Sequence, residues 1–260
     1  MKSITRYFNK VCAEKYGPLG FSKTRTEFDK KQIVFFRISE DVIQSFTLKR
    51  FRGVPICTVE FEIDPLCAGA PIYLGVGDEL DRFSVEQHAK YGGWKYQPLV
   101  EQSVVECVNA MSETMDKYLI PLFDRCVNCA AALPELIKTE ELFEKNRIEV
   151  LCLKGRIDCA TSIGQEDMLF DDRKYYMALK SHDLAYARKY LRFQISYREK
   201  ELKNTNNSDS VRERFSCNLN RDREQLKQLE SAGFDYFDPL LSKNEDEARK
   251  YLAEQYPQIR

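Results

Sequence analysis

The sequence predicts an α+β protein: an N-terminal helix, an antiparallel sheet covered by helices, and an all-helical C-terminal half. Two observations predict this class. Apolar residues alternate with other residues through a block from Phe28 to Asp64, as expected of strands with one covered face. On both sides of this block, apolar residues recur at helical spacing. We therefore expect an α+β domain over 1–133 and a helical region over 134–260, and whether the two pack as one unit stays open.

The first element is an amphipathic helix, with Ser3 in position to cap its N-terminus. Its apolar side chains are Ile4, Tyr7, Phe8 and Val11. Gly17-Pro18 should end it, because proline disfavours helical geometry in the residue before it. Leu19 to Phe21 then turn the chain into the sheet.

Three or four strands follow, and short connections between them favour antiparallel hairpins over crossovers. The expected strands are Thr26–Asp29, Ile33–Ser39, Val42–Phe51 and Pro55–Ile63, with a further candidate at Ile72–Val76. Turns are expected at Glu40-Asp41 and at Arg52-Gly53. In the last strand, the alternation places Cys57 on one face and Glu60 on the other.

The sequence predicts helices and loops for the rest of the chain. An apolar stripe from Val100 to Leu119 predicts a helix from Pro98, which Pro121 should interrupt before a short helix at Leu122–Leu133. Later helices are expected at Pro134–Lys145, Asp172–Lys180, Asp183–Lys203, Val211–Leu229 and Glu245–Tyr256. The pentapeptide Ala187–Leu191 recurs as Ala248–Leu252. Two copies are fewer than a solenoid needs, so we favour shared inward packing of Ala, Tyr and Leu over a helical-repeat array.

Composition argues against several classes of function. The chain has 40 Lys and Arg against 41 Asp and Glu, a net charge of −1, where a dedicated nucleic-acid binder shows a basic excess. The basic run Lys49–Arg52 is interpreted as a solvated hairpin rim. No stretch approaches the ~18 apolar residues of a membrane span. Nine cysteines, an odd number without dense spacing, indicate reduced thiols and a cytoplasmic location.

One stretch resembles a known family. The segment Tyr16–Lys23, the strands from Phe28 to Asp64, Trp94 and the helix from Pro98 together resemble the N-terminal half of bacterial domain-of-unknown-function family 4304. The resemblance implies a helix, a Leu-Gly-Phe turn, an antiparallel sheet and a bacterial cytosolic origin. It implies no activity, and no site residue carries over from it.

The cysteines provide weak candidates for metal or redox chemistry. Cys126 and Cys129 form a CxxC pair, but helical sequence precedes it, whereas redox motifs begin a helix after a strand. Cys152 and Cys159 would be needed to complete a zinc site, and their spacing is wide. We therefore expect buried structural thiols, no metal and no cofactor.

Five residues are the candidates for ligand binding. His88, Tyr91 and Trp94 lie in a glycine-containing loop region that could line a pocket. Glu60 and Glu62 share a strand face with Asp64, a row suited to a cation or to paired-carboxylate chemistry. The competing interpretation is a surface histidine and the wet side of a half-covered sheet.

No motif assembles a nucleophile, a base and an orienting group, so the sequence predicts no catalytic residue. We expect a non-catalytic module that binds another protein, of which an immunity protein against a bacterial effector is one version. The alternative is an enzyme or small-ligand binder whose pocket joins His88 and Trp94 to the Glu60–Asp64 face. The discriminating observation is whether these side chains meet in one pocket.

Overall fold

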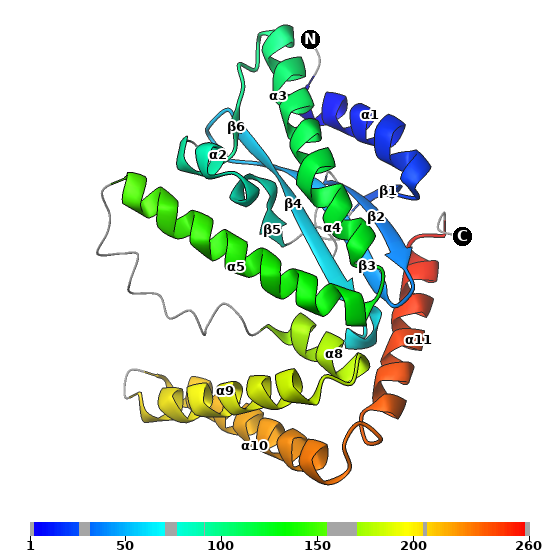
Figure 1. The fold of residues 1–260 in the computed structure, drawn as a ribbon, viewed down its shortest axis with the longest axis vertical. Helices are drawn as coiled ribbons and strands as arrows, with labels where there is room; N and C mark the ends of the chain where they lie inside the picture. Colours follow the sequence, from blue (N-terminus) through cyan, green and yellow to red (C-terminus); the bar gives the residue numbers. More distant parts are fainter. Residues whose placement is uncertain are drawn as a thin grey trace.

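The computed structural model describes residues 3–25, 32–70, 77–90, 92–154, 171–204 and 207–257. It confirms the predicted α+β class, with an antiparallel sheet and a helical C-terminal half (Figure 1). The strands are β1 (Ser22–Arg25), β2 (Ile33–Ser39), β3 (Val42–Arg50), β4 (Ile56–Pro65), β5 (Asp78–Glu79) and β6 (Trp94–Lys95). The helices are α1 (Ile4–Tyr16), α2 (Val85–Lys90), α3 (Glu101–Thr114), α4 (Ile120–Arg125), α5 (Cys129–Leu153), α8 (Asp172–Lys180), α9 (Leu184–Lys203), α10 (Asp209–Ser231) and α11 (Asp238–Gln255).

The sheet runs in the order β1-β2-β3-β4-β5 with antiparallel pairing throughout, and β6 also pairs with β4. The predicted strand Ile33–Ser39 is confirmed at both ends, as is the hairpin that joins it to β3. β1 is not among the predicted strands; it follows the Leu-Gly-Phe turn, and its Ser22 pairs with Phe36. The predicted strands Thr26–Asp29 and Ile72–Val76 lie outside the described residues.

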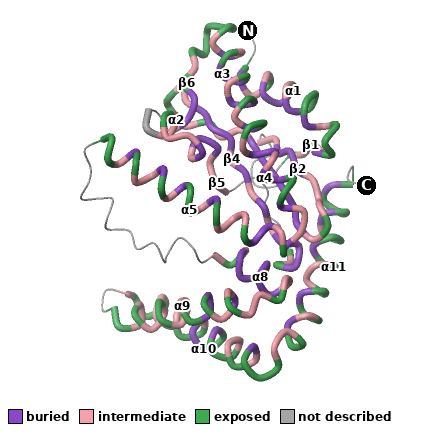
Figure 2. Tube along the Cα trace, viewed as in Figure 1, coloured by how far each residue is buried: buried purple, intermediate pink, exposed green. Residues whose placement is uncertain are grey.

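The two faces of the sheet are covered by different parts of the chain. The front face packs Phe46, Phe61 and their neighbours into a large apolar core with α1, α3, α4 and α5, and α8 and α9 contribute to the same core. On the back face, Val34 and Phe36 pack against Leu252 of α11 in a second, smaller cluster. Figure 2 shows buried residues concentrated along the strands and on the inner sides of these helices. The expected boundary at 133/134 falls inside α5, and the large core contains residues from both sides of it.

Two prolines are placed differently from expectation. Pro121 does not interrupt its helix: α3 continues through a π turn at Met115–Leu119 directly into α4. The wider turn accommodates a residue that lacks an N–H and crowds the carbonyl of the preceding turn. The break falls instead at Cys126, and α5 begins at Cys129 and runs through Pro134. The predicted helices Leu122–Leu133 and Pro134–Lys145 are therefore wrong in their bounds.

The last helices agree more closely with the sequence. The helix Asp172–Lys180 is confirmed at both ends, and Asp183 caps α9 by accepting a hydrogen bond from the Tyr186 N–H. α9 and α10 form an antiparallel hairpin at one end of the molecule, whereas α11 returns to the sheet (Figure 1). The two copies of the pentapeptide therefore lie in different settings, although their Ala and Leu residues are buried in both. Among the described residues, no helix is long and apolar enough to cross a membrane.

Candidate functional site

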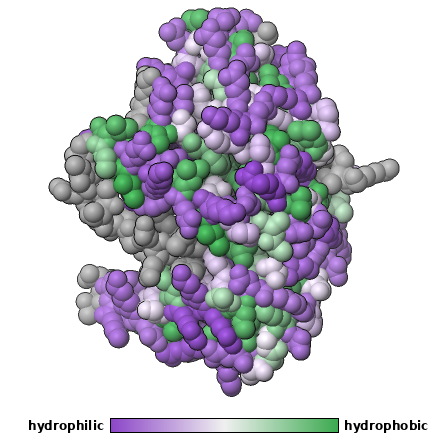
Figure 3. All heavy atoms as spheres, in the orientation of Figure 1, coloured by the Kyte–Doolittle hydropathy of each residue, from purple (hydrophilic) through white to green (hydrophobic). Residues whose placement is uncertain are grey.

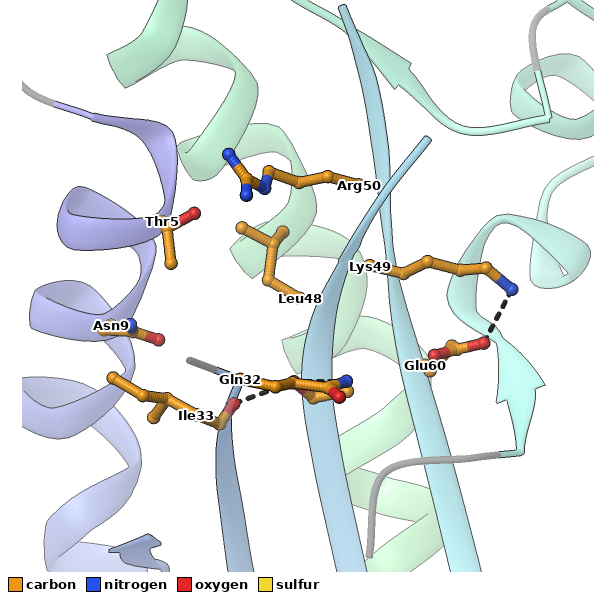
Figure 4. A pocket seen from close by; sticks show the side chains of 9 residues that line it. Thr5, Asn9, Gln32, Ile33, Leu48, Lys49, Arg50 and Glu60 are labelled. Atoms are coloured by element: carbon orange, nitrogen blue, oxygen red, sulfur yellow. Dashed lines mark hydrogen bonds and ion pairs between the residues drawn. The ribbon is translucent and has the colours of Figure 1, made fainter. Parts of the chain in front are cut away.

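A groove runs between α1 and the sheet. It consists of two adjoining cavities of about 290 and 920 Å³ that share Thr5, Asn9 and Ile33. Thr5 and Asn9 lie four residues apart on α1 and therefore project from the same side of the helix. Figure 4 shows these two side chains facing Leu48 and Arg50 of β3 across the smaller cavity.

The helix wall of the groove carries polar groups that lack protein partners. Asn9 is only 5% exposed, yet its side-chain amide makes no hydrogen bond to any described residue. The hydroxyl of Thr5 is also buried without a hydrogen-bond partner. A buried polar group left unpaired costs roughly 1–3 kcal/mol. A ligand with a hydrogen-bonding group would remove this cost at Thr5.

The lining of the groove is basic, although the chain as a whole carries a net charge of −1. Among the described residues, five cations and two carboxylates line it: Arg6, Lys10, Lys23, Lys49, Arg50, Glu60 and Glu101. Within the described part of the chain, Arg6, Lys23 and Arg50 form no ion pair. Successive strand residues point to opposite faces, so Arg50 projects toward α1 while Lys49 projects away (Figure 4).

Glu60, one of the predicted ligand-binding residues, lies on the far side of this groove. It is held by Lys49, whose Nζ is 2.6 Å from Glu60 Oε1 and 2.8 Å from Glu79 Oε1. Glu60 and Glu79 both neutralise Lys49, and Lys10 pairs with Glu14, so the uncompensated charge among the described lining residues comes from Arg6, Lys23 and Arg50. Glu60 therefore fixes Lys49 and is not a free carboxylate for a ligand cation.

Glu62 and Asp64 share the back face of β4 with Glu60, as the alternation predicts. Their setting differs from a solvated sheet surface, because Arg173 of α8 reaches them from 111 residues away in sequence. Its Nη1 lies 3.3 Å from Glu62 Oε1 and its Nε lies 4.0 Å from Asp64 Oδ1. Burial raises the pKa of Asp64 to about 6, and the charge of Arg173 limits the rise. This row joins the sheet to α8.

His88 is positioned by a buried carboxylate. Its Nδ1 lies 2.8 Å from Oδ2 of Asp81, and the other oxygen of Asp81 accepts a 2.7 Å hydrogen bond from the Thr58 hydroxyl. Thr58 belongs to the same back face of β4 as Glu60, so His88 is tied to the predicted strand face through Asp81. Such a pair orients an imidazole and leaves Nε2 for proton exchange or ligation. Among the described residues, no hydroxyl or thiol hydrogen-bonds to that nitrogen.

Trp94 lies on the other side of the sheet. It pairs with Cys57 in the β4–β6 ladder, is 4% exposed and belongs to the front core. Tyr91 lies outside the described residues. The predicted site residues that are described therefore do not converge on one pocket. Glu60 lines the groove, Glu62 pairs with Arg173, His88 pairs with Asp81, and Trp94 lies in the core.

The groove residues Thr5, Asn9 and Arg50 did not emerge as site candidates from the sequence. One signal was present: Asn9 falls within the helical stripe formed by Ile4, Phe8, Cys12 and Tyr16, all of which are buried. A polar side chain on the covered side of an amphipathic helix points either to an internal partner or to a cavity. Arg50 belongs to the basic run Lys49–Arg52, which the sequence alone favours as a solvated hairpin rim.

The weak metal candidates Cys126 and Cys129 are both buried, and burial raises the pKa of Cys126 to about 12. A hydrogen bond with Cys67 and burial raise the pKa of Cys129. Neither thiol is thus activated as a redox nucleophile. Cys152 lies at the other end of α5, about 35 Å from Cys129 at 1.5 Å per residue, too far for a shared zinc ion. Cys159 lies outside the described residues, among which no cluster of three His, Cys, Asp or Glu side chains suits a metal ion.

A scan of the chain against protein-family profiles, a search of the curated proteins and a search of the solved structures each gave no match. The functional argument therefore rests on this chain's own residues, and the resemblance to family 4304 stays a prediction.

Proposed function

We propose that this protein is a non-catalytic binding module whose groove takes an acidic, extended segment of a partner protein. The observation that carries the proposal is the local charge: the described lining residues include five cations and two carboxylates, in a chain with a net charge of −1. Arg6, Lys23 and Arg50, which form no ion pair among the described residues, supply the attraction. Complementary charge of this kind guides encounter and selects among partners.

A peptide fits the groove better than a simple anion does. The Asn9 amide both donates and accepts, as a peptide group does, and the Thr5 hydroxyl can do the same. Tyr7 is the single aromatic side chain among the described lining residues, whereas single-stranded nucleic acids are held by several stacking aromatics. Figure 3 shows a mostly hydrophilic surface, with apolar groups among the polar ones, on the face it draws.

The placement of the candidate residues favours binding over catalysis. His88 and Trp94 lie apart from the groove, and Glu60 within it is paired with Lys49. A role as an immunity protein, with a bacterial effector as the partner, is the version of this function that the family resemblance suggests. In that version the effector would present the acidic segment.

The direct test is a titration of the full chain with fluorescently labelled dodecapeptides, followed by fluorescence polarisation. One peptide set alternates Asp or Glu with apolar residues, a second replaces the acids by Gln, and a third replaces them by Lys. We expect saturable binding of the acidic set alone, weakened by added salt. Arg50→Glu should weaken it by about tenfold, because reversal exchanges ~0.7 kcal/mol of attraction for as much repulsion.

Two matched variants distinguish peptide binding in the groove from nonspecific attraction by the charge of the whole protein. Lys227→Glu makes the same change on exposed α10, far from the groove in sequence, and should leave binding intact. Asn9→Leu keeps the volume but removes the amide, and should weaken acidic-peptide binding without changing its salt dependence. Equal binding by the Arg50→Glu variant and the parent would refute the proposal. So would tighter binding of a thymidine oligonucleotide of the same charge.

A further inference from the structure

Three sulfur atoms meet where β4 packs against α3. Cys57 projects from the front face of β4, and Cys107 and Met111 lie one turn apart on α3. The Cys57 Sγ is 3.7 Å from the Cys107 Sγ and 3.8 Å from the Met111 Sδ. Cys57 and Met111 are fully buried, and Cys107 is 6% exposed. We refer to these three residues as the sulfur cluster.

We propose that the sulfur cluster is a binding site for a soft monovalent metal ion, cuprous copper. Zinc–thiolate bonds are ~2.3 Å long, and three sulfurs at that distance around an ion in their plane lie about 4.0 Å apart. The separations of Cys57 Sγ from the other two sulfurs are within a few tenths of an ångström of that value. Two thiols and a thioether form a donor set that selects Cu(I). Zinc prefers four ligands, and thioethers are poor donors for it.

Binding is a proton-for-metal exchange with no change of oxidation state. One Cu⁺ replaces the two thiol protons, the thioether adds without losing a proton, and the product carries one negative charge. The two thiols are already in contact, because the Cys57 Sγ and the Cys107 Sγ lie within hydrogen-bond distance and either can donate to the other. Arg50 sits opposite Cys57 in the β3–β4 register and lies on the same face of the sheet. Its positive charge compensates the negative product.

Access to the sulfur cluster is through the edge of the sheet. The carbonyl of Trp94 lies 3.7 Å from the Cys57 Sγ and 4.0 Å from the Cys107 Sγ. Trp94 belongs to β6, which contains two residues and follows Gly92 and Gly93. Cys107 is 6% exposed, so the sulfur cluster lies close to the surface at this edge of the sheet.

The test is an anaerobic titration of the reduced full chain with Cu(I), using a chromophoric Cu(I) chelator as competitor. Cys152 and Cys217, which are exposed, and Cys159, which lies outside the described residues, are replaced by serine in every protein, so that these three thiols do not contribute. We expect one tightly bound equivalent, and X-ray absorption should show three sulfur neighbours near ~2.3 Å with no nitrogen or oxygen. No peptide is present, so the outcome is independent of the groove proposal.

Three variants locate the ion. Cys107→Ala should abolish the tight equivalent, and Met111→Leu, a volume-conserving change, should weaken Cu(I) binding by roughly tenfold or more through loss of one ligand. Cys67→Ala removes another buried thiol at the opposite end of β4 and should leave binding unchanged. Circular dichroism checks that each variant folds. The proposal is overturned if the parent binds no tight equivalent, if Met111→Leu binds as the parent does, or if Cys67→Ala is the variant that loses the ion.

Discussion

Gln44 joins the centre of the sheet to the break between α4 and α5, and its replacement should destabilise the protein substantially. Its side chain is fully buried, and Nε2 donates to the carbonyls of Phe123 at 2.6 Å and Cys126 at 2.8 Å. Its Oε1 accepts a 2.6 Å hydrogen bond from Nε of Arg37. The amide thus satisfies the carbonyl end of α4, where helical hydrogen bonding stops.

Gln44→Leu keeps the volume and removes all three hydrogen bonds. The carbonyl of Phe123 still accepts a hydrogen bond from the N–H of Cys126 at 3.2 Å. Losing its hydrogen bond with Gln44 therefore costs about 1 kcal/mol. A buried carbonyl deprived of its side-chain donor, as at Cys126, costs roughly 1–3 kcal/mol. Arg37 keeps Asp124 and the carbonyl of Leu19, so its loss is small. The free energy of unfolding should therefore fall by about 2–4 kcal/mol.

Urea denaturation, followed by circular dichroism and by the fluorescence of the single tryptophan, measures this difference. Trp94 is buried in the front core, so its emission reports on the same cooperative unit. Gln102→Leu is the matched control, because Gln102 is exposed and bonds only to Glu106 on the surface of α3. The control should stay within about 0.5 kcal/mol of the parent. A Gln44→Leu variant as stable as the control would refute the reasoning.

Three further predictions follow from buried charges and backbone geometry. The pKa of Asp64 is raised to about 6, so its protonated form stabilises the fold fully below pH ~4, and this contribution is lost as the pH rises toward 6. The free energy of unfolding of Asp64→Asn should therefore exceed that of the parent by up to about 2–3 kcal/mol at pH 7.5 and equal it at pH 4. A difference between the two proteins that does not change with pH would contradict this. Lys174 is buried and ion-paired with Glu140, so Lys174→Met should lower the free energy of unfolding by roughly 3–5 kcal/mol. Urea denaturation should show that the double variant Lys174→Met/Glu140→Met recovers most of this loss. Gly93 has φ 148°, and a Cβ there would lie 2.6 Å from the Cys57 carbonyl oxygen. In the same assay, Gly93→Ala should lower the free energy of unfolding by more than about 2 kcal/mol. Gly92 has φ 65° and open space around it, so Gly92→Ala should lower the free energy of unfolding by about 1 kcal/mol.

Elements governed by local periodicity were predictable from the sequence. The bounds of α1, β2 and α8 follow from side-chain spacing and from residues that begin or end helices, such as Pro18 and Asp171. Likewise, the shared face of Glu60, Glu62 and Asp64 follows from the two-residue period of a strand. Each of these inferences needs only neighbours within a few positions in the chain.

Proline was a less certain guide, because its effect depends on what surrounds the helix. At Pro121 a π turn absorbs the missing N–H, and at Pro134 the helix continues from an N-terminal end that is held by other contacts. Asn128 caps α5, and the N–H of Cys129 donates to Asp41, a residue 88 positions earlier. The sequence around Pro134 carries no trace of that contact.

The sequence by itself determined the fold class, the strand alternation and the balanced composition, since these depend on residue types and their spacing. Only the tertiary structure decided what covers each face: Arg173 crosses to Glu62, α11 covers the back of β2, and Trp94 turns into the core rather than toward a ligand. It also decided that Asn9 and Arg50 face one groove, and that Cys57, Cys107 and Met111 meet. The reason is physical: periodicity specifies which side chains share a surface, whereas the partner of that surface is chosen by packing between segments far apart in the chain.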